Sequence, residues 1–311
     1  MKLALLFPGQ GSQVVGMGQA LAASSEAAKR TFEAADRALG RSISKLCFEG
    51  PDAELALTFN TQPALVTTSM AVLAAIRERY PDLPTPAFAA GHSLGEYTAL
   101  VAASALALED AVRLVELRGR AMQDAVPPGE GAMAAILGGD RATVEALCQE
   151  ARQDDVLEPA NFNAPSQVVI SGTKPAVTRA VELATARKLK AVLLNVSAPF
   201  HCSLMASAAR TVGGALSSVA FSKPRFPIVS NVDATAHDDP EVLRSCLVRQ
   251  VDAAVLWEQS VAAMAEAGVT HALEIGPGKV LAGLVKRIDK RIAVLSVGDS
   301  AGIEQIPTFL G

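Results

Sequence analysis

A serine between two glycines is the residue of this chain whose setting best fits a nucleophile. Ser93 lies in Gly91-His92-Ser93-Leu94-Gly95, between the short apolar run Ala87 to Ala90 and an alanine-rich helical pattern that reaches Leu106. This order of strand, sharp turn and helix is typical of a nucleophile elbow. Glycines on both sides of the serine let the backbone form a tight turn. The free N–H groups at the start of the helix stabilise the negative charge that develops during attack by the serine. We therefore expect Ser93 to attack a substrate.

A nucleophilic serine needs a base, and the chain has only four histidines. His92 lies inside the elbow, His237 lies in a loop that we expect to be exposed, and His271 precedes a predicted strand. His201 follows a predicted strand, in the loop Ser197 to Cys202, and comes after the serine in the chain, as in hydrolase-like sheets. His201 is the best placed general base, although a surface or capping role for it stays open.

An arginine lies on the apolar face of the predicted helix Glu109 to Gln123. At helical spacing, Arg118 shares a stripe with Leu114, Val115 and Met122. A guanidinium in that position needs an anionic partner or a route to solvent, because an unpaired buried charge is costly. An internal ion pair and a carboxylate-binding role are both compatible with the sequence.

The first strand is followed by a glycine-containing loop. Leu3 to Phe7 is a short continuous apolar run, which predicts a buried strand of a parallel sheet, and it ends at Pro8-Gly9-Gln10-Gly11-Ser12-Gln13. An open α/β sheet places ligand-binding backbone at such a loop, and the glycines permit a close approach. An ordinary strand-to-helix turn would have the same composition. The loop lacks the Gly-Lys-Ser/Thr ending of a phosphate-binding P-loop.

The pattern around these motifs predicts an α/β fold with a parallel sheet. Helix-length segments between the first strand and the elbow imply crossover connections. Beyond the elbow, strands are expected at 225–229 and 272–275 and helices at 255–266 and 280–288, with 272–275 as the last core strand. The helices expected before the elbow are Ser25 to Leu39, Pro51 to Leu57 and Ala64 to Arg79, the last preceded by Asn60-Thr61-Gln62-Pro63.

A second unit is predicted in the middle of the chain. After the composition break Val126-Pro127-Pro128-Gly129, strands and helices follow in the order β-α-β-β-α-β within about 70 residues, which is the ferredoxin-like order. We expect residues 128–196 to form this small α+β domain, inserted into a large domain made of residues 1–127 and 197–311.

Composition excludes several classes of protein. Half of the 311 residues are apolar and 19% are charged, and the net charge of −4 argues against binding to nucleic acid or an anionic membrane. The four cysteines are scattered, which favours free thiols in a reducing compartment over disulfides or a metal site. No apolar run is long enough for a signal segment or a membrane span. We expect a cytoplasmic protein without a metal or a bound organic cofactor.

Several motifs follow one another in a fixed order along the chain. They are Pro8-Gly9-Gln10-Gly11-Ser12-Gln13, Gly91-His92-Ser93-Leu94-Gly95-Glu96-Tyr97, Arg118, Asn161-Phe162-Asn163, Pro199-Phe200-His201 and Glu274-Ile275-Gly276-Pro277-Gly278. Together they resemble those of the malonyl-CoA:acyl carrier protein transacylases of type II fatty acid synthesis. The likeness runs from about Leu3 to Ile288 and extends to the acyltransferase domains of polyketide synthases. It implies a large α/β-hydrolase-like, or patatin-like, domain with a small ferredoxin-like insertion.

The resemblance implies a role for each site residue. Ser93 would attack the malonyl thioester while His201 takes its proton, and the backbone carbonyl of Gln250, in place of an acid, would orient the histidine. The backbone N–H groups of Gln10 and Leu94 would form the oxyanion hole. Arg118 would bind the malonyl carboxylate and exclude acetyl groups. His92 and Asn163 would lie beside the pocket in supporting roles.

The substrates implied are malonyl-CoA and holo acyl carrier protein, and we expect a monomer. Phe200 departs from the small residue that bacterial fatty acid synthesis relatives often have there and resembles malonyl-selective polyketide acyltransferases, so a polyketide pathway is an alternative. Two other hypotheses about the function stay open. A serine esterase or lipase would use Ser93 with water as the acceptor, and a non-catalytic module would hold carrier protein or malonyl groups without turnover.

Overall fold

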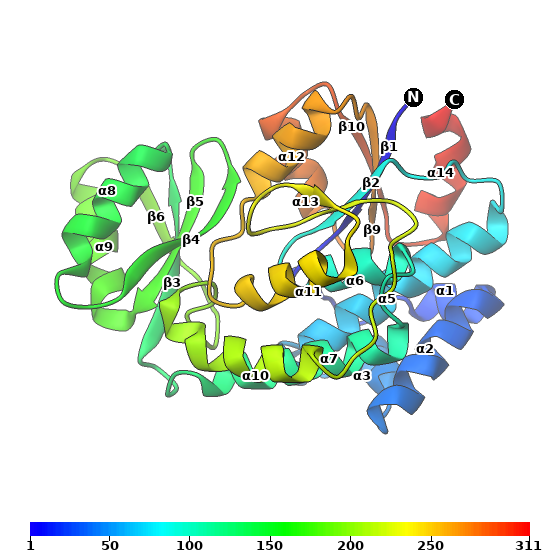
Figure 1. Ribbon diagram of the computed structural model, residues 1–311, viewed down its shortest axis with the longest axis horizontal. Helices are drawn as coiled ribbons and strands as arrows, with labels where there is room; N and C mark the ends of the chain where they lie inside the picture. The colour runs from blue at the N-terminus through cyan, green and yellow to red at the C-terminus, as the bar shows by residue number, and fades with distance from the viewer.

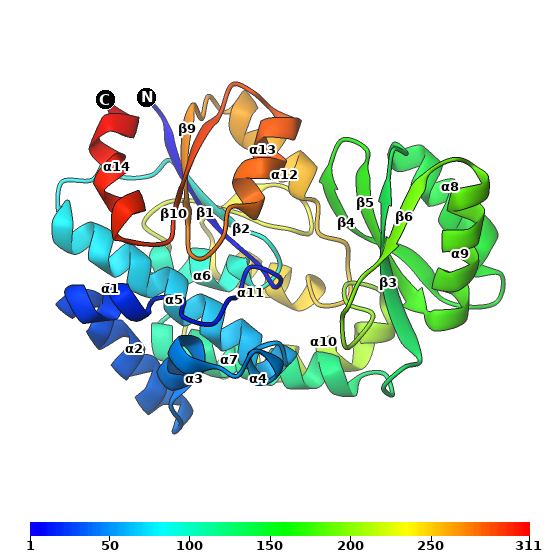
Figure 2. The same ribbon diagram turned by 180° about the vertical axis from the view of Figure 1, so that it is seen from behind.

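The chain folds around two separate β-sheets, one of six strands and one of four. The structure, a computed structural model, describes residues 1–311. The six-strand sheet and most helices form one large unit that holds both termini, and the four-strand sheet lies at the other end of the molecule (Figures 1 and 2). The predicted α/β class is therefore confirmed as a mixed α/β fold.

The large sheet is mostly parallel and has the order β10-β9-β1-β2-β7-β8. Its central strand, β1 (Leu3–Phe7), pairs in parallel with β2 (Phe88–Gly91) on one side and with β9 (His271–Ile275) on the other. Only the β7–β8 pair is antiparallel. The outer strands are β7 (Ile228–Val229), β8 (Ala236–His237) and β10 (Ala293–Val297).

Helices cover both faces of this sheet, which is why its central strand β1 is apolar throughout. In β1, Leu3, Leu5 and Phe7 face a core of 55 buried residues, whereas Ala4 and Leu6 face a second core of 16. The first core is built with α1 (Gln19–Ser24), α2 (Glu26–Leu39), α3 (Ile43–Glu49), α4 (Asp52–Leu55), α5 (Thr58–Arg79), α6 (Gly95–Ala102), α7 (Leu108–Asp124), α10 (Ala206–Leu216), α11 (Pro240–Arg249) and α14 (Ser300–Leu310). The second lies under α12 (Trp257–Glu266) and α13 (Val280–Ile288).

The small unit has its own antiparallel sheet and its own core of 14 buried residues. Two helices lie side by side on the outer face of this sheet (Figure 1). The order along the chain is the predicted one, and the sheet order is β4-β5-β3-β6. Its elements are β3 (Gly131–Leu137), α8 (Arg141–Arg152), β4 (Leu157–Ala164), β5 (Gln167–Thr173), α9 (Lys174–Ala186) and β6 (Lys190–Leu193).

Backbone hydrogen bonds tie the two units together at one edge of the small sheet. Val255, just before α12, donates from its N–H to Ala160 O and accepts from the N–H of Phe162, both at 2.9 Å. Because Ala160 and Phe162 belong to β4, this contact fixes one wall of the space between the units.

The structure corrects three expectations for individual elements. Helix α5 begins at Thr58, so Pro63 lies inside it; Asn60 and Thr61 donate side-chain hydrogen bonds back to Glu54 O and Leu55 O, which stabilises the early start. The strand expected at 225–229 is reduced to β7, because Pro227 has no N–H to donate. The run 272–275 is not the last strand, since β10 and α14 follow it.

The remaining predicted elements are present, with ends that shift by a few residues. None of the helices combines the length and the apolar character needed to cross a membrane.

Candidate active site

Ser93 lies on a strained turn between β2 and α6, with a φ of 52°. The two flanking glycines are required by close packing. A Cβ on Gly91 would lie 1.9 Å from the carbonyl carbon of Gly95, and a Cβ on Gly95 would lie 2.3 Å from Phe7 O. The elbow geometry that the motif predicts is therefore present, and it depends on close contact with the end of β1.

Asn231 holds both ends of this turn. It follows β7, and its Oδ1 accepts a hydrogen bond from Ser93 N at 2.7 Å while its Nδ2 donates to Gly91 O at 2.7 Å. No motif in the sequence predicts a role for Asn231. Its position just after a predicted parallel strand could have indicated a role in the site, because ligand-binding and catalytic groups gather at the carboxyl ends of such strands.

His201 is hydrogen-bonded to the serine, as expected for a base. Its Nε2 lies 2.7 Å from Ser93 Oγ, and its Nδ1 lies 2.8 Å from Gln250 O. A carbonyl oxygen only accepts, so Nδ1 carries the proton and Nε2 is free to accept the proton of the hydroxyl. The carbonyl of Gln250 thus occupies the place that an acid has in other triads.

Burial keeps the imidazole of His201 neutral. The side chain is 4% exposed, and desolvation, followed by repulsion from the Arg118 guanidinium, lowers its pKa to about 3. The hydrogen bond to Gln250 O opposes this shift only in part. A histidine in this state can act as a base at any physiological pH.

Arg118 is buried and has no anionic partner. Its Nη1 donates to Gln62 Oε1 at 2.8 Å, and its Nη2 donates to Ser93 Oγ at 3.1 Å and to Gln250 Oε1 at 3.0 Å. None of the ion pairs of the structure includes it. Its Nε has no acceptor at all. The internal ion pair is therefore excluded, and a charged donor is left facing the serine.

Two backbone N–H groups next to the serine are also free. Neither Gln10 N nor Leu94 N donates to any acceptor in the structure, and both residues line the same cavity as Ser93. The loop carrying Gln10 comes close to the elbow because Gly9 has no side chain: a Cβ there would lie 2.6 Å from His92 O. Gln10 and Leu94 thus each offer an unpaired backbone donor, and an oxyanion hole requires two such donors.

His92 and Asn163 contact each other beside the cavity. His92 Nε2 lies 2.8 Å from Asn163 Oδ1, and burial lowers the pKa of the imidazole. His92 lines the cavity, whereas Asn163 does not; Asn161, two residues earlier on β4, lines it instead.

The cavity lies between the two units and has a volume of about 120 Å³. Both polar and apolar side chains line it. The sequence analysis missed several of the lining residues because their spacing is that of ordinary core positions. The lining residues are Gln10, Gln62, His92, Ser93, Leu94, Arg118, Met122, Met133, Asn161, Leu194, Val196, Phe200 and His201.

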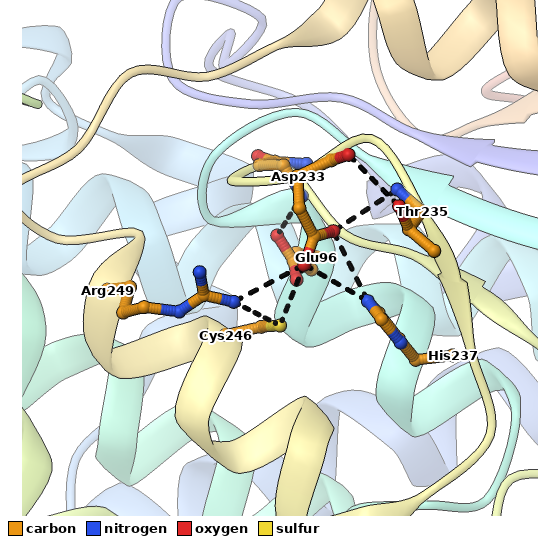
Figure 3. A network of polar contacts seen from close by, with 7 residues as sticks. Glu96, Asp233, Thr235, His237, Cys246 and Arg249 are labelled. Atoms are coloured by element: carbon orange, nitrogen blue, oxygen red, sulfur yellow. Dashed lines mark hydrogen bonds and ion pairs between the residues drawn. The ribbon is translucent and has the colours of Figure 1, made fainter.

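A second polar cluster lies behind the site. Asp233, His237 and Cys246 bring three potential metal-binding atoms within 4.8 Å of one another. Figure 3 shows the Arg249 guanidinium reaching the same cluster; it lies 3.3 Å from Asp233 Oδ2 and 3.2 Å from Cys246 Sγ. A cationic side chain already neutralises this cluster. His237, expected in an exposed loop, is half-buried in β8.

This site is typical of α/β proteins with a serine–histidine acyl-transfer site. The serine lies in an elbow at the end of a parallel strand, is hydrogen-bonded to a histidine and is close to unpaired backbone donors. Comparison with known proteins narrows this class. The chain belongs to the acyl transferase domain family, whose sequence model matches residues 4–303.

Individual relatives are similar over more than nine tenths of their length. The malonyl CoA-acyl carrier protein transacylase of Escherichia coli K12 is 48% identical over 288 residues, which cover 92% of this chain and 93% of the relative. The crystal structure of the acyl-carrier-protein S-malonyltransferase of Burkholderia pseudomallei superimposes with a TM-score of 0.96 at 47% identity and covers 99% of this chain and 100% of that one. A malonyl-transacylase in complex with its type II polyketide synthase acyl-carrier protein superimposes with a TM-score of 0.95 at 43% identity, with 98% of both chains covered.

Proposed function

We propose that this protein transfers the malonyl group of malonyl-CoA to the phosphopantetheine thiol of acyl carrier protein and thereby supplies fatty acid synthesis. One observation carries the proposal: a nucleophile, a base and an unpaired cation meet at a single oxygen. Ser93 Oγ lies 2.7 Å from His201 Nε2 and 3.1 Å from Arg118 Nη2. The family and the malonyl-specific relatives support the same reaction.

In the first half-reaction, Ser93 Oγ attacks the thioester carbonyl carbon while His201 Nε2 takes the hydroxyl proton. The carbonyl oxygen becomes an oxyanion that accepts hydrogen bonds from the N–H groups of Gln10 and Leu94. When the intermediate collapses, the carbon–sulfur bond breaks and the coenzyme A sulfur takes the proton from His201. The products are a malonyl ester on Ser93 and free coenzyme A.

The second half-reaction is the same path with a new thiol. The phosphopantetheine thiol of the carrier protein loses its proton to His201 and attacks the ester carbonyl. Ser93 then leaves and recovers that proton, and malonyl carrier protein departs. Gln250 O holds the histidine in the required tautomer throughout, and the contact of His92 with Asn163 supports the loop that carries the elbow.

Arg118 gives the reaction its preference for malonyl groups. A carboxylate in the cavity would meet Nε, which has no acceptor, and Nη2, which already points at Ser93. An acetyl group offers no such acceptor and leaves the guanidinium buried without a counter-charge. The site should therefore discriminate strongly against acetyl-CoA.

The fold also supports a proposal for the domain boundaries. We infer a catalytic α/β-hydrolase-like, or patatin-like, domain of residues 1–127 and 197–311 and a ferredoxin-like domain of residues 128–196, with the phosphopantetheine arm entering between them. We also infer a monomer in the cytoplasm, where the four cysteines, all free thiols, suit a reducing medium.

A polyketide pathway is the second candidate. Phe200 lines the cavity beside His201, and one similar structure is a malonyl-transacylase bound to a polyketide carrier protein. The reaction is the same in both pathways, so parallel transfer rates to fatty acid and polyketide carrier proteins from the source organism would decide between them.

The experiment that tests the proposal follows the fate of the malonyl group. The protein is incubated with malonyl-CoA, with and without holo acyl carrier protein, and malonyl carrier protein and free malonate are quantified. We expect transfer to exceed hydrolysis at least about a hundredfold. Release of malonate at the same rate without the carrier would indicate a serine hydrolase instead, and the absence of any turnover would indicate a binding module.

A further inference from the structure

A buried carboxylate that the mechanism does not use lies directly behind the catalytic residues. Glu96 is in the first turn of α6, and its side chain is fully buried. Its Oε2 accepts a hydrogen bond from Gln250 Nε2 at 2.7 Å and another from Asn231 N at 3.1 Å. Its Oε1 has no partner. A buried carboxylate with so few partners is costly, which calls for a functional explanation.

Gln250 links this carboxylate to all three functional residues, to Ser93 through its backbone carbonyl. Its Nε2 donates to Glu96 Oε2 and also to Ser93 O at 2.9 Å. Its Oε1 accepts from Arg118 Nη2, and its backbone oxygen accepts from His201 Nδ1. The position of one glutamine therefore sets the surroundings of the nucleophile, the base and the guanidinium together.

The charge of Glu96 strengthens an orientation of the Gln250 amide that two other groups also favour: Arg118 Nη2, which only donates, and Ser93 O, which only accepts. An ionised carboxylate only accepts hydrogen bonds, so it selects the orientation in which Nε2 faces Glu96 and Oε1 faces Arg118. A protonated carboxyl can donate to Oε1 and so permits the opposite orientation. In that orientation the Gln250 amide would point a donor at Arg118, which has only donors to offer.

We propose that Glu96 is a positioning residue for malonyl transfer: its ionised carboxylate fixes the amide of Gln250 and thereby holds Arg118 ready for the malonyl carboxylate. The inference rests on the proposed function. Although Glu96 and Arg118 form no ion pair, the negative charge of Glu96 also favours the charged state of the Arg118 guanidinium.

The charge of Glu96 changes near neutral pH. Burial raises its pKa to about 7, against the opposing hydrogen bonds from Gln250 and Asn231. The ionised form, and with it the positioned Arg118, should therefore be lost as the pH falls below 7. The charged or titratable groups that face Glu96 or its immediate neighbours are Tyr97 on α6, Arg118 on α7, Asp233 after β7, His237 on β8, Cys246 and Arg249 on α11, and His201.

The test compares Glu96→Gln with a matched control, Glu274→Gln. Glu274 is also a fully buried glutamate with a raised pKa, but it binds the N–H groups of Leu281 and Ala282 at the start of α13, away from Ser93. The initial rates at which malonyl-CoA and acetyl-CoA acylate Ser93 are measured from pH 6 to pH 8. Labelling of Ser93 by a fluorophosphonate, which needs no malonyl recognition, is measured in parallel.

We expect the ratio of malonyl to acetyl acylation in the wild type to rise with pH through about 7. In Glu96→Gln it should be at least about tenfold lower at pH 8 and nearly independent of pH, whereas Glu274→Gln should follow the wild type. The melting temperature of Glu96→Gln at pH 8 should not fall, because the ionised form of a carboxyl with a raised pKa is the less stable one. A merely structural glutamate would lose stability and leave the ratio unchanged.

Three results would overturn the proposal: a ratio in Glu96→Gln within twofold of the wild type, a pH dependence that survives the substitution, or an equal loss in Glu274→Gln. If Glu96→Gln does not fold, Glu96→Asp replaces it; this variant keeps the charge, so the pH dependence should remain while the ratio falls.

If malonyl-CoA acylates no variant, including the wild type, the proposed function fails. The Glu96 proposal then fails with it. If malonyl-CoA acylates the wild type but the ratio is unchanged in Glu96→Gln, the Glu96 proposal alone is overturned. Fluorophosphonate labelling should be similar in Glu96→Gln and Glu274→Gln.

Discussion

The side chain of Asn231 holds the backbone of Ser93: its Oδ1 accepts the N–H of Ser93 at 2.7 Å, and its Nδ2 binds the other end of the turn at Gly91 O. A serine with a φ of 52° is strained, so its conformation has to be stabilised by its neighbours. These two hydrogen bonds supply part of that stabilisation.

The variant Asn231→Ala should therefore lose both stability and reactivity. We expect the free energy of unfolding to fall by about 1–3 kcal/mol, because a buried N–H and a buried carbonyl lose their partner. Chemical denaturation measures the loss, and fluorophosphonate labelling should show a slower Ser93. Asn195→Ala, at an exposed position, should change the free energy of unfolding by less than about 0.5 kcal/mol. Equal stability of the two variants would contradict this role for Asn231.

Two glycine substitutions test the packing of the elbow. Gly95→Ala should prevent correct folding or abolish Ser93 acylation, because its Cβ would lie 2.3 Å from Phe7 O in the centre of the large sheet. Gly214→Ala in α10 is the control: nothing lies within 4 Å of its Cβ, so it should raise the stability by about 0.5–1 kcal/mol. Thermal unfolding of both variants provides the measurement. An active, stable Gly95→Ala protein would show that the close contact is not required.

Arg118 substitutions test substrate preference. In Arg118→Ala the acylation of Ser93 by malonyl-CoA should fall by about a hundredfold or more, whereas acylation by acetyl-CoA should change little or increase. Arg118→Lys should recover only part of the malonyl rate, because an ammonium lacks the planar pair of donors. Arg120→Ala, on the exposed face of the same helix, should keep the wild-type preference. If malonyl and acetyl rates fell together in Arg118→Ala, the arginine would have a structural role only.

The buried neutral state of His201 should appear in the stability of the protein at acid pH. The pKa of this imidazole is lowered from 6.5 to about 3 by folding, so its contribution to stability is complete above pH 6.5 and is lost as the pH falls towards 3. Relative to His201→Gln, the wild type should lose about 1.4 kcal/mol per pH unit in that window. The raised pKa of Glu96 acts in the opposite direction but is common to both proteins. Denaturation at a series of pH values measures the difference, and parallel curves would show that His201 titrates normally.

The sequence predicted the elements of this fold better than their ends. Continuous apolar runs and helical stripes located β1, β2, α7 and the six elements of the small unit, because burial on one or two faces leaves a clear period in the sequence. The start of α5 was missed because Pro63 suggested a boundary, and the side-chain hydrogen bonds of Asn60 and Thr61 that allow the earlier start are not visible in a sequence. The edge strand β10 was not predicted either, because its side chains are only partly buried and leave a weak pattern in the sequence.

In the candidate site, too, the residues could be predicted more readily than the contacts between them. Ser93, His201 and Arg118 were located by residue type, context and resemblance, and the structure brings these three side chains together. Their meeting point could not be derived from spacing, since the three residues come from separate parts of the chain. Asn231 belongs to no sequence motif, and Glu96 lies within the elbow motif without a predicted role. Their importance depends on which groups they contact, and only the fold determines those contacts.

The covalent intermediate is the most direct test of the central claim. The protein and its Ser93→Ala variant are each mixed with malonyl-CoA, and the intact mass is recorded before and after holo acyl carrier protein is added. The account predicts one malonyl group on the wild type, none on the variant, and complete transfer of that group to the carrier protein. A malonyl group that also forms on Ser93→Ala, or that stays on the protein when the carrier protein is present, would contradict it.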